Sequence, residues 1–228
     1  MRLRNIPGAK ETVANSACVV QEPQTRKGRW KEVFHRENPI HIEVGMGKGQ
    51  FLMKMAAKNP QINYLGMEMY DSVLLRALQL REKLEAEPDN LLFIREDARL
   101  LPEIFEQGEV EKIYLNFSDP WPKARHAKRR LTSREFLARY EKILVDRGEV
   151  EFKTDNRTLF DFSLEEIRDA GWTLLACTYD LHRDARLSQG NVMTEYEEKF
   201  SGMGKPICKL IAARSRKQRR FTEERRRA

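Results

Sequence analysis

Residues 40–49 read IHIEVGMGKG, and this stretch decides the fold. Its first five residues are rich in β-branched side chains, which predicts a short buried strand. Gly45, Gly47 and Gly49 follow at alternate positions, and glycine permits a positive φ and a close approach of a ligand to the backbone. From Lys48 to Lys58 the apolar residues have helical spacing. The glycines therefore form a loop between a strand and a helix.

The same alternation of strands and helices continues along the chain. Strands are predicted over residues 63–69, 91–94, 113–117, 149–153, 172–179 and 207–213, and helices over residues 71–84, 134–144 and 158–170. Alternation of this kind predicts an α/β fold, with a mostly parallel sheet covered by helices on both faces. Right-handed connections bring the strand ends that carry ligands to one edge of such a sheet.

The glycine spacing separates the classes of nucleotide-binding loop. A dinucleotide fingerprint requires glycine at position 50, where Gln50 stands, so a dehydrogenase is disfavoured. A P-loop requires Ser or Thr after Lys48, where Gly49 stands. An acid, Glu43, precedes the loop, which suits a ligand that has an amino-acid end and no pyrophosphate. We expect Glu43 and the three glycines to hold S-adenosylmethionine.

Two further acids follow the next two predicted strands. Glu68 ends the strand over 63–69, where a carboxylate can accept both hydroxyls of a ribose. Asp97 follows the strand over 91–94 and can accept from an adenine amino group. Each acid alone is compatible with an ordinary solvated strand end. Together with Glu43 they place three acids at three successive strand ends, which favours a cofactor pocket.

The segment IYLNFSDPWPK at residues 113–123 joins an apolar strand to an acid and a Pro-Trp-Pro turn. Proline fixes φ, so this loop is expected to be rigid, and a rigid loop at a strand end indicates a binding surface. Residues 123–130 follow with five Lys or Arg and one His, which favours contact with phosphates. Trp121 is compatible with stacking on an unpaired base and with a purely structural role.

The composition of the 228 residues, 40% hydrophobic and 34% charged, predicts a soluble, cytoplasmic protein. The apolar runs are far shorter than the ~20 residues of a membrane span, so no membrane association is expected. Three cysteines without a CxxC pair make a disulfide framework and a metal site improbable.

Positive charge is concentrated at the two ends. Residues 1–31 hold seven Lys or Arg against two acids, residues 214–228 hold eight against two, and the part between them has a net charge of −4. We expect a basic, poorly ordered segment over 1–30, one domain over 31–213 and a basic tail over 214–228. Basic ends attract polyanions, although solvated tails have the same composition.

Several motifs together resemble the bacterial tRNA (guanine-N7)-methyltransferase family. They are EVGMGKG, GMEMY, NFSDPWPKARHAKRR, EFKTDN and TEYE at residues 194–197, and the likeness extends over roughly residues 30–213. The resemblance implies a Rossmann-like class I S-adenosylmethionine methyltransferase with a seven-stranded sheet whose last strand is antiparallel. It also implies methylation of the variable-loop guanosine at position 46 of tRNA, by a monomer or a homodimer.

The resemblance assigns roles to residues at matching positions. Glu43, Glu68, Asp97 and Asp119 would line the cofactor site, and Asp119 would also be catalytic. The target nucleotide would be contacted by Lys123, Asp155, Thr194, Glu195, Tyr196 and Glu197. RNA would be contacted by Arg125, His126, Lys128, Arg129 and Arg130.

Guanine N7 has a lone pair and no proton, so its methylation needs no general base. We therefore expect Asp119 to orient the base and to stabilise developing positive charge. Two alternatives remain open from the sequence. One is a methyltransferase that acts on an exocyclic amine of adenine or on protein glutamine, and the other is a non-catalytic RNA-binding protein that retains the fold.

Overall fold

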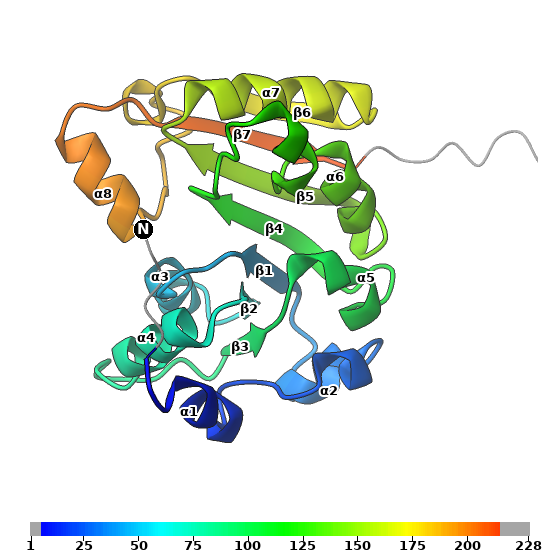
Figure 1. Cartoon of the computed structure of the whole chain (residues 1–228), viewed down its shortest axis with the longest axis vertical. Coiled ribbons are helices and arrows are strands. Elements are labelled where there is room, and N and C mark those ends of the chain that lie inside the picture. The colour runs from blue at the N-terminus through cyan, green and yellow to red at the C-terminus, as the bar shows by residue number, and fades with distance from the viewer. Residues whose placement is uncertain (1–5, 215–228) are drawn as a thin grey trace, which may run out of the picture.

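The computed structural model describes residues 6–214, which build one seven-stranded sheet between two layers of helices (Figure 1). The strands are β1 (Ile40–Val44), β2 (Asn63–Glu68), β3 (Leu91–Arg95), β4 (Val110–Asn116), β5 (Leu144–Thr154), β6 (Thr173–Thr178) and β7 (Cys208–Ala213). Their order is β3-β2-β1-β4-β5-β7-β6, and β7 is antiparallel to both of its neighbours. The predicted α/β fold with an antiparallel last strand is confirmed.

The strand order reverses between β1 and β4, which pair in parallel with Glu43 opposite Tyr114. The loops that leave these two strands at their carboxyl ends therefore diverge to opposite faces of the sheet. Open α/β sheets bind ligands in the crevice at such a reversal. This crevice is where the glycine loop and the Pro-Trp-Pro loop begin.

Helices cover both faces of the sheet. One layer holds α1 (Ala9–Asn15), α3 (Gln50–Lys58) and α4 (Asp71–Arg81), whose buried side chains form one core cluster with Tyr64, Phe93 and Tyr114. The other layer holds α2 (Trp30–Phe34), α5 (Leu101–Ile104), α6 (Arg134–Tyr140) and α7 (Arg157–Asp169), packed on Ile42 and Phe152. A further helix, α8 (Glu195–Gly202), lies beside the carboxyl ends of β4 and β5 (Figure 1).

The prediction of a poorly ordered segment over 1–30 is wrong for residues 6–30. This segment contains α1 and a 3₁₀ turn (Pro23–Arg26), and Val19 forms a parallel bridge with Phe93 at the edge strand β3. The Trp30 side chain is fully buried. The few apolar residues of this segment are enough to order it, because they pack against the edge strand β3, which would otherwise be exposed. Residues 1–5 and the predicted tail beyond Arg214 lie outside the described residues.

Three other expectations need correction. The helix expected over 134–144 ends at Tyr140, and β5 already begins at Leu144. The helix expected over 71–84 begins at Asp71 but ends at Arg81. Helix α8 was not predicted at all.

Candidate functional site

A cavity lies at the reversal of strand order, between the glycine loop, the end of β4 and the first turn of α8. Its lining comprises Glu43, Gly45, Met46, Gly47, Lys48, Gly49, Gln50, Phe51, Asn116, Phe117, Thr194, Glu195 and Tyr196. The structure thus brings together residues that are up to 153 positions apart in the chain, including the predicted Glu43, the three glycines and three residues of the TEYE motif.

The glycines of the loop are required by backbone conformation. Gly45 and Gly47 have φ values of +75° and +58°, which side chains rarely adopt. A Cβ added at either position would meet no atom within 4 Å, so both glycines border open space. Gly49 also has a positive φ, of +73°, and is the N-cap of α3. The loop therefore presents bare backbone to the cavity at the start of a helix.

Three buried acceptors at the cavity have no partner, which is the arrangement expected of a ligand site. Glu43 is almost fully buried, and its Oε1 accepts from Asn116 Nδ2 at 2.7 Å. Glu43 Oε2, Asn116 Oδ1 and Gln50 Oε1 are buried without a hydrogen bond among the described residues. Unpaired buried acceptors are costly and call for an explanation. An amino-acid end, with its ammonium group, is a donor that would satisfy them.

Burial also changes the ionisation of Glu43. Desolvation raises the pKa of Glu43 to about 8, and the hydrogen bond from Asn116 and the charge of Lys153 oppose this rise only partly. The carboxyl group is thus poised to ionise when a cation reaches its free oxygen.

The other two predicted acids do not line this cavity. Glu68 accepts the backbone N–H groups of Gly47, Met69 and Tyr70 at 3.3, 2.9 and 3.2 Å, so it braces the glycine loop. Burial raises the pKa of Glu68. Asp97 caps the turn that follows β3, and its carboxylate binds the guanidinium of Arg99. The hydrogen bonds from Arg99 lower the pKa of Asp97. Contact of these acids with ribose and adenine stays a prediction.

The loop after β4 is held in a strained shape. Phe117 and Trp121 have φ values of +52° and +42°, which are uncommon for residues with side chains and which occur often at functional sites. Arg130 supports this shape, because its Nε and Nη2 each donate at 3.1 Å to the carbonyl oxygens of Pro120 and Trp121. Asp119 is exposed, and its charge reaches Glu68 and contributes to the raised pKa of that group.

The basic stretch forms a 3₁₀ segment (Ala124–Arg129) beside this loop. Arg129 lies over the Trp121 ring at 5.0 Å, and the His126 ring meets the same indole edge-on at 5.6 Å. Lys123 and Arg125 are exposed. Arg130 differs from its neighbours, since its guanidinium is engaged with loop carbonyls and lies over the Phe162 ring at 4.3 Å. Arg130 therefore shapes the loop, and its contact with RNA stays a prediction.

The TEYE motif serves more than one purpose. Thr194 caps α8 by accepting the N–H of Glu197 at 2.9 Å, and Glu195 pairs with Lys48 of the glycine loop at 3.0 Å. Tyr196 lies against the Phe117 ring at 4.7 Å, and its hydroxyl donates to Asp155 Oδ2 at 3.4 Å. These contacts place the first turn of α8 over the cavity.

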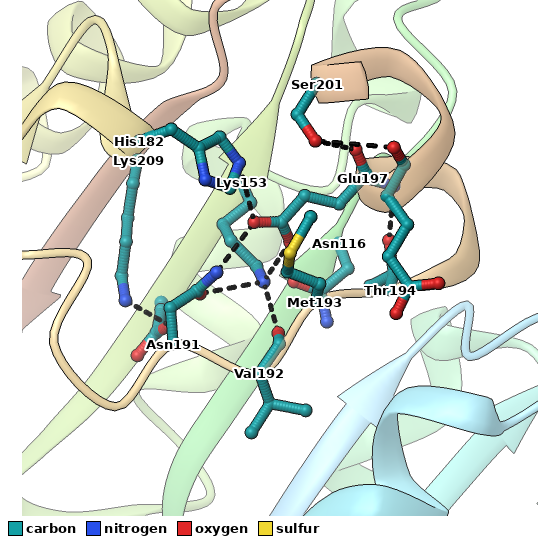
Figure 2. A network of polar contacts seen from close by, with 12 residues as sticks. Asn116, Lys153, His182, Asn191, Val192, Met193, Thr194, Glu197, Ser201 and Lys209 are labelled. Atoms are coloured by element: carbon teal, nitrogen blue, oxygen red, sulfur yellow. Dashed lines mark hydrogen bonds and ion pairs between the residues drawn. The ribbon is translucent and has the colours of Figure 1, made fainter.

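Glu197 differs from the other three residues of the TEYE motif, because it does not line the cavity. Its side chain is fully buried and accepts from Lys153 Nζ at 2.6 Å and from Asn191 Nδ2 at 2.7 Å (Figure 2). These donors hold Glu197 within the protein, and its contact with a nucleotide stays a prediction.

Sequence reasoning missed Asn116 and Lys153, which connect the two sides of the site. Asn116 occurs in NFSDPWPK and Lys153 in EFKTDN, so both lie within quoted motifs. A polar side chain at the end of an apolar strand was the available signal. Only the pairing of β4 with β5, which sets Asn116 opposite Lys153, shows that they are neighbours.

Residues 6–214 contain neither a membrane-spanning helix nor a cluster of metal ligands. No helix in this range has the length and apolar character that crossing a membrane requires. The same residues contain no group of three or more His, Cys, Asp or Glu side chains placed to hold a metal ion.

Comparison with known proteins gives consistent matches. The family described as "Putative methyltransferase" matches residues 37–210. The tRNA (guanine-N(7)-)-methyltransferase of Lachnoclostridium phytofermentans is 59% identical over 216 residues, covering 95% of this chain and 100% of that protein. The protein of the same name from Lysinibacillus sphaericus is 53% identical, covering 92% of this chain and 96% of its own length.

Solved structures share the fold at much lower identity. A 16S rRNA (adenine(1408)-N(1))-methyltransferase from Catenulisporales acidiphilia, solved with its cosubstrate S-adenosylmethionine, is 11% identical with a TM-score of 0.57. The match covers 89% of this chain and 95% of that one. At this identity the likeness establishes the methyltransferase fold alone.

Proposed function

Because the chain belongs to the tRNA (guanine-N(7)-)-methyltransferase family, we propose that it transfers a methyl group from S-adenosylmethionine to N7 of the variable-loop guanosine of tRNA. The observation that carries this proposal for the chain itself is the set of unpaired buried acceptors, Glu43 Oε2, Asn116 Oδ1 and Gln50 Oε1, beneath a glycine loop at the strand reversal.

The residues at the cavity fit the cofactor by their chemistry. Glu43 and Asn116 would accept from the ammonium of its amino-acid end, and the bare backbone of Gly45 and Gly47 leaves room for close approach. Glu68 holds Gly47 in place through Oε2, and the same oxygen retains a lone pair that could accept from a ribose hydroxyl. When bound, S-adenosylmethionine supplies a methyl group activated by a positively charged sulfur.

Asp119 and the loop around it act on the acceptor base in this proposal. Guanine N7 needs no general base, so the contribution of the protein is orientation and charge stabilisation. Asp119 is exposed in the loop after β4, and its charge reaches Glu68; a carboxylate there could accept from the N1–H and amino group of guanine. Its negative charge would also stabilise the cationic purine. Lys123, Arg125 and Lys128 would bind phosphates beside it.

The decisive experiment uses unmodified tRNA transcripts and identifies the product by nucleoside mass spectrometry. We expect 7-methylguanosine in a transcript with the variable-loop guanosine and none in the transcript with adenosine at that position. Methylated adenosine in either transcript would overturn the assignment of the acceptor. In the same assay Asp119→Asn should lower kcat by about 10²–10³, as the loss of one well-placed electrostatic group does. Wild-type turnover should show no solvent deuterium isotope effect, since no proton moves.

A further inference from the structure

Helix α8 is attached to the rest of the protein in an unusual way. Within this helix, all of whose residues the structure describes, Glu197 is the one buried side chain. Its other attachments are half-exposed. They include the ion pairs Lys48–Glu195 and Lys54–Glu198, the hydrogen bond from Tyr196 to Asp155 and the tilted contact of the Tyr196 and Phe117 rings. Exposed ion pairs contribute little to stability. The helix that forms one wall of the cavity is thus anchored by a charge instead of by an apolar stripe.

The partner of Glu197 is equally buried and lies in the sheet. Lys153, on β5, donates from Nζ to Glu197 Oε2 at 2.6 Å, to the Val192 carbonyl oxygen at 3.0 Å and to Asn191 Oδ1 at 3.3 Å. Asn191 donates in turn to Glu197 Oε1 at 2.7 Å, and His182 Nε2 approaches that oxygen at 3.3 Å. Figure 2 shows these side chains converging on the pair from β5, the loop before α8 and the 3₁₀ turn (Leu181–Arg183).

Lys153 also touches the cofactor side of the cavity. Its ammonium lies 5.2 Å from the ring centroid of Phe51, a lining residue on α3. It is paired in register with Asn116, and its carbonyl oxygen accepts the N–H of Phe117 at 2.9 Å. Its charge acts on Glu43 as well, since it counters the rise in the pKa of that carboxyl. One side chain therefore contacts both walls.

We propose that the buried Lys153–Glu197 pair is a positioning device that docks α8 against β5 and so sets the width of the cofactor cavity. Glu197 acts through Thr194, Glu195 and Tyr196, which line the cavity one turn earlier, and it does not contact the substrate itself. A charged anchor of this kind specifies one position of the helix, because any displacement would leave two buried charges unpaired. The effect of the Lys153–Glu197 pair on methyl transfer rests on the proposed function, whereas the docking of α8 by this pair does not depend on it.

The test replaces both charges at once, because removing one partner of a buried pair strands the other and destabilises the whole protein. The variant is Lys153→Met/Glu197→Gln, which keeps both shapes. The matched control is Lys209→Met/Glu151→Gln. Lys209 lies opposite Lys153 on β7 and pairs with Glu151 at 2.8 Å, with both side chains nearly buried and neither lining the cavity. Glu151 also pairs with Lys112, which keeps Glu149 as a partner at 3.2 Å in the control.

Two readouts report on docking and on the cavity. In the Lys153/Glu197 variant we expect amide hydrogen exchange in α8 to be about tenfold faster, with α7 unchanged. We also expect the Kd for S-adenosylhomocysteine, measured by calorimetry, to rise about tenfold. The control variant should leave both quantities as in wild type. Unchanged exchange and affinity in the Lys153/Glu197 variant would overturn the proposal.

Kinetics separate positioning from a loss of folded protein. A positioning role raises the KM for S-adenosylmethionine and leaves kcat at saturating cofactor within about twofold. If the pair only stabilises the fold, the apparent kcat falls in proportion to the folded fraction and the KM is unchanged. That outcome would contradict the proposal. If wild type bound no S-adenosylhomocysteine, the proposed function would fail, while hydrogen exchange in α8 would still test the docking.

Discussion

Glu43 carries the chemistry of the site at the scale of a single residue. It is the residue before the last in β1, is buried, and has one oxygen bound to Asn116 and one oxygen without a hydrogen-bond partner among residues 6–214. Desolvation raises its pKa from 4.5 to about 8, so near neutral pH the carboxyl of the free protein is mostly protonated. A bound ammonium group requires the carboxylate. Cofactor binding is therefore expected to release a proton.

This gives a prediction with a defined sign. Between pH 6 and 8 the Kd for S-adenosylhomocysteine should fall as pH rises, by at most about tenfold per pH unit, because one proton must leave before the ion pair forms. Calorimetry in buffers of different ionisation heat should show release approaching one proton at pH 6. In Glu43→Gln the affinity should be weaker and independent of pH over this range. Proton release that persists in Glu43→Gln would assign the effect to another group.

The same shift acts on stability in the opposite sense. A carboxyl whose folded pKa is raised contributes stability below its unfolded pKa of 4.5, and that contribution is lost as pH rises through about 8. Buried Glu43 therefore lowers the free energy of unfolding of the ligand-free protein near neutral pH, and ligand binding removes this loss. Ionisable residues whose pKa is shifted by burial are common at functional sites.

At the scale of elements, the basic stretch and its loop have separate tasks. Arg130 shapes the loop through the carbonyls of Pro120 and Trp121, whereas Arg125 is exposed. We expect Arg125→Ala to raise the KM for tRNA and to reduce the slope of log affinity against log salt by roughly 0.7–0.9 per lost phosphate contact. Affinity for S-adenosylhomocysteine should not change.

Arg130→Ala serves as the comparison within the same stretch. This substitution should loosen the loop that contains Pro120 and Trp121, and it should reduce kcat by displacing Asp119. The slope of log affinity against log salt should change less than in Arg125→Ala. Equal salt slopes for the two variants would refute this division of tasks. The two arginines are indistinguishable in the sequence KARHAKRR, and only the carbonyls that face Arg130 separate them.

The elements also show why sequence reasoning succeeded in one place and failed in another. Strand β1 was predictable because its apolar residues and the glycines after it carry local signals of conformation. Helix α8 has no apolar stripe, since its buried side chain is Glu197. A helix held by a charge in a distant strand leaves no periodic pattern, and the partner Lys153 is one of several charged residues in β5, so nothing in the sequence distinguishes it.

At the scale of the whole molecule, the N-terminal segment belongs to the domain that it was expected to precede. Cys18 and Val20 exchange backbone hydrogen bonds with Phe93 at the edge of the sheet, at 2.8 and 2.9 Å. Trp30 stacks on Phe105 at 5.1 Å and donates from its indole to the Ile104 carbonyl oxygen at 2.9 Å. Few residues make these contacts, so hydropathy did not reveal them, but each contact is buried.

These contacts predict one cooperative unfolding unit that includes residues 6–30. Trp30→Ala should lower the free energy of unfolding by about 3–5 kcal/mol, because it leaves a large cavity in the core beneath α5 and removes a donor to a buried carbonyl. Urea unfolding followed by circular dichroism should shift to a lower midpoint with an unchanged slope, as a two-state loss requires. Val192→Ala, at a half-buried position near the loop before α8, provides a milder comparison. A midpoint unaffected by Trp30→Ala, or a separate early transition in the wild-type protein, would show that the N-terminal segment folds apart from the sheet.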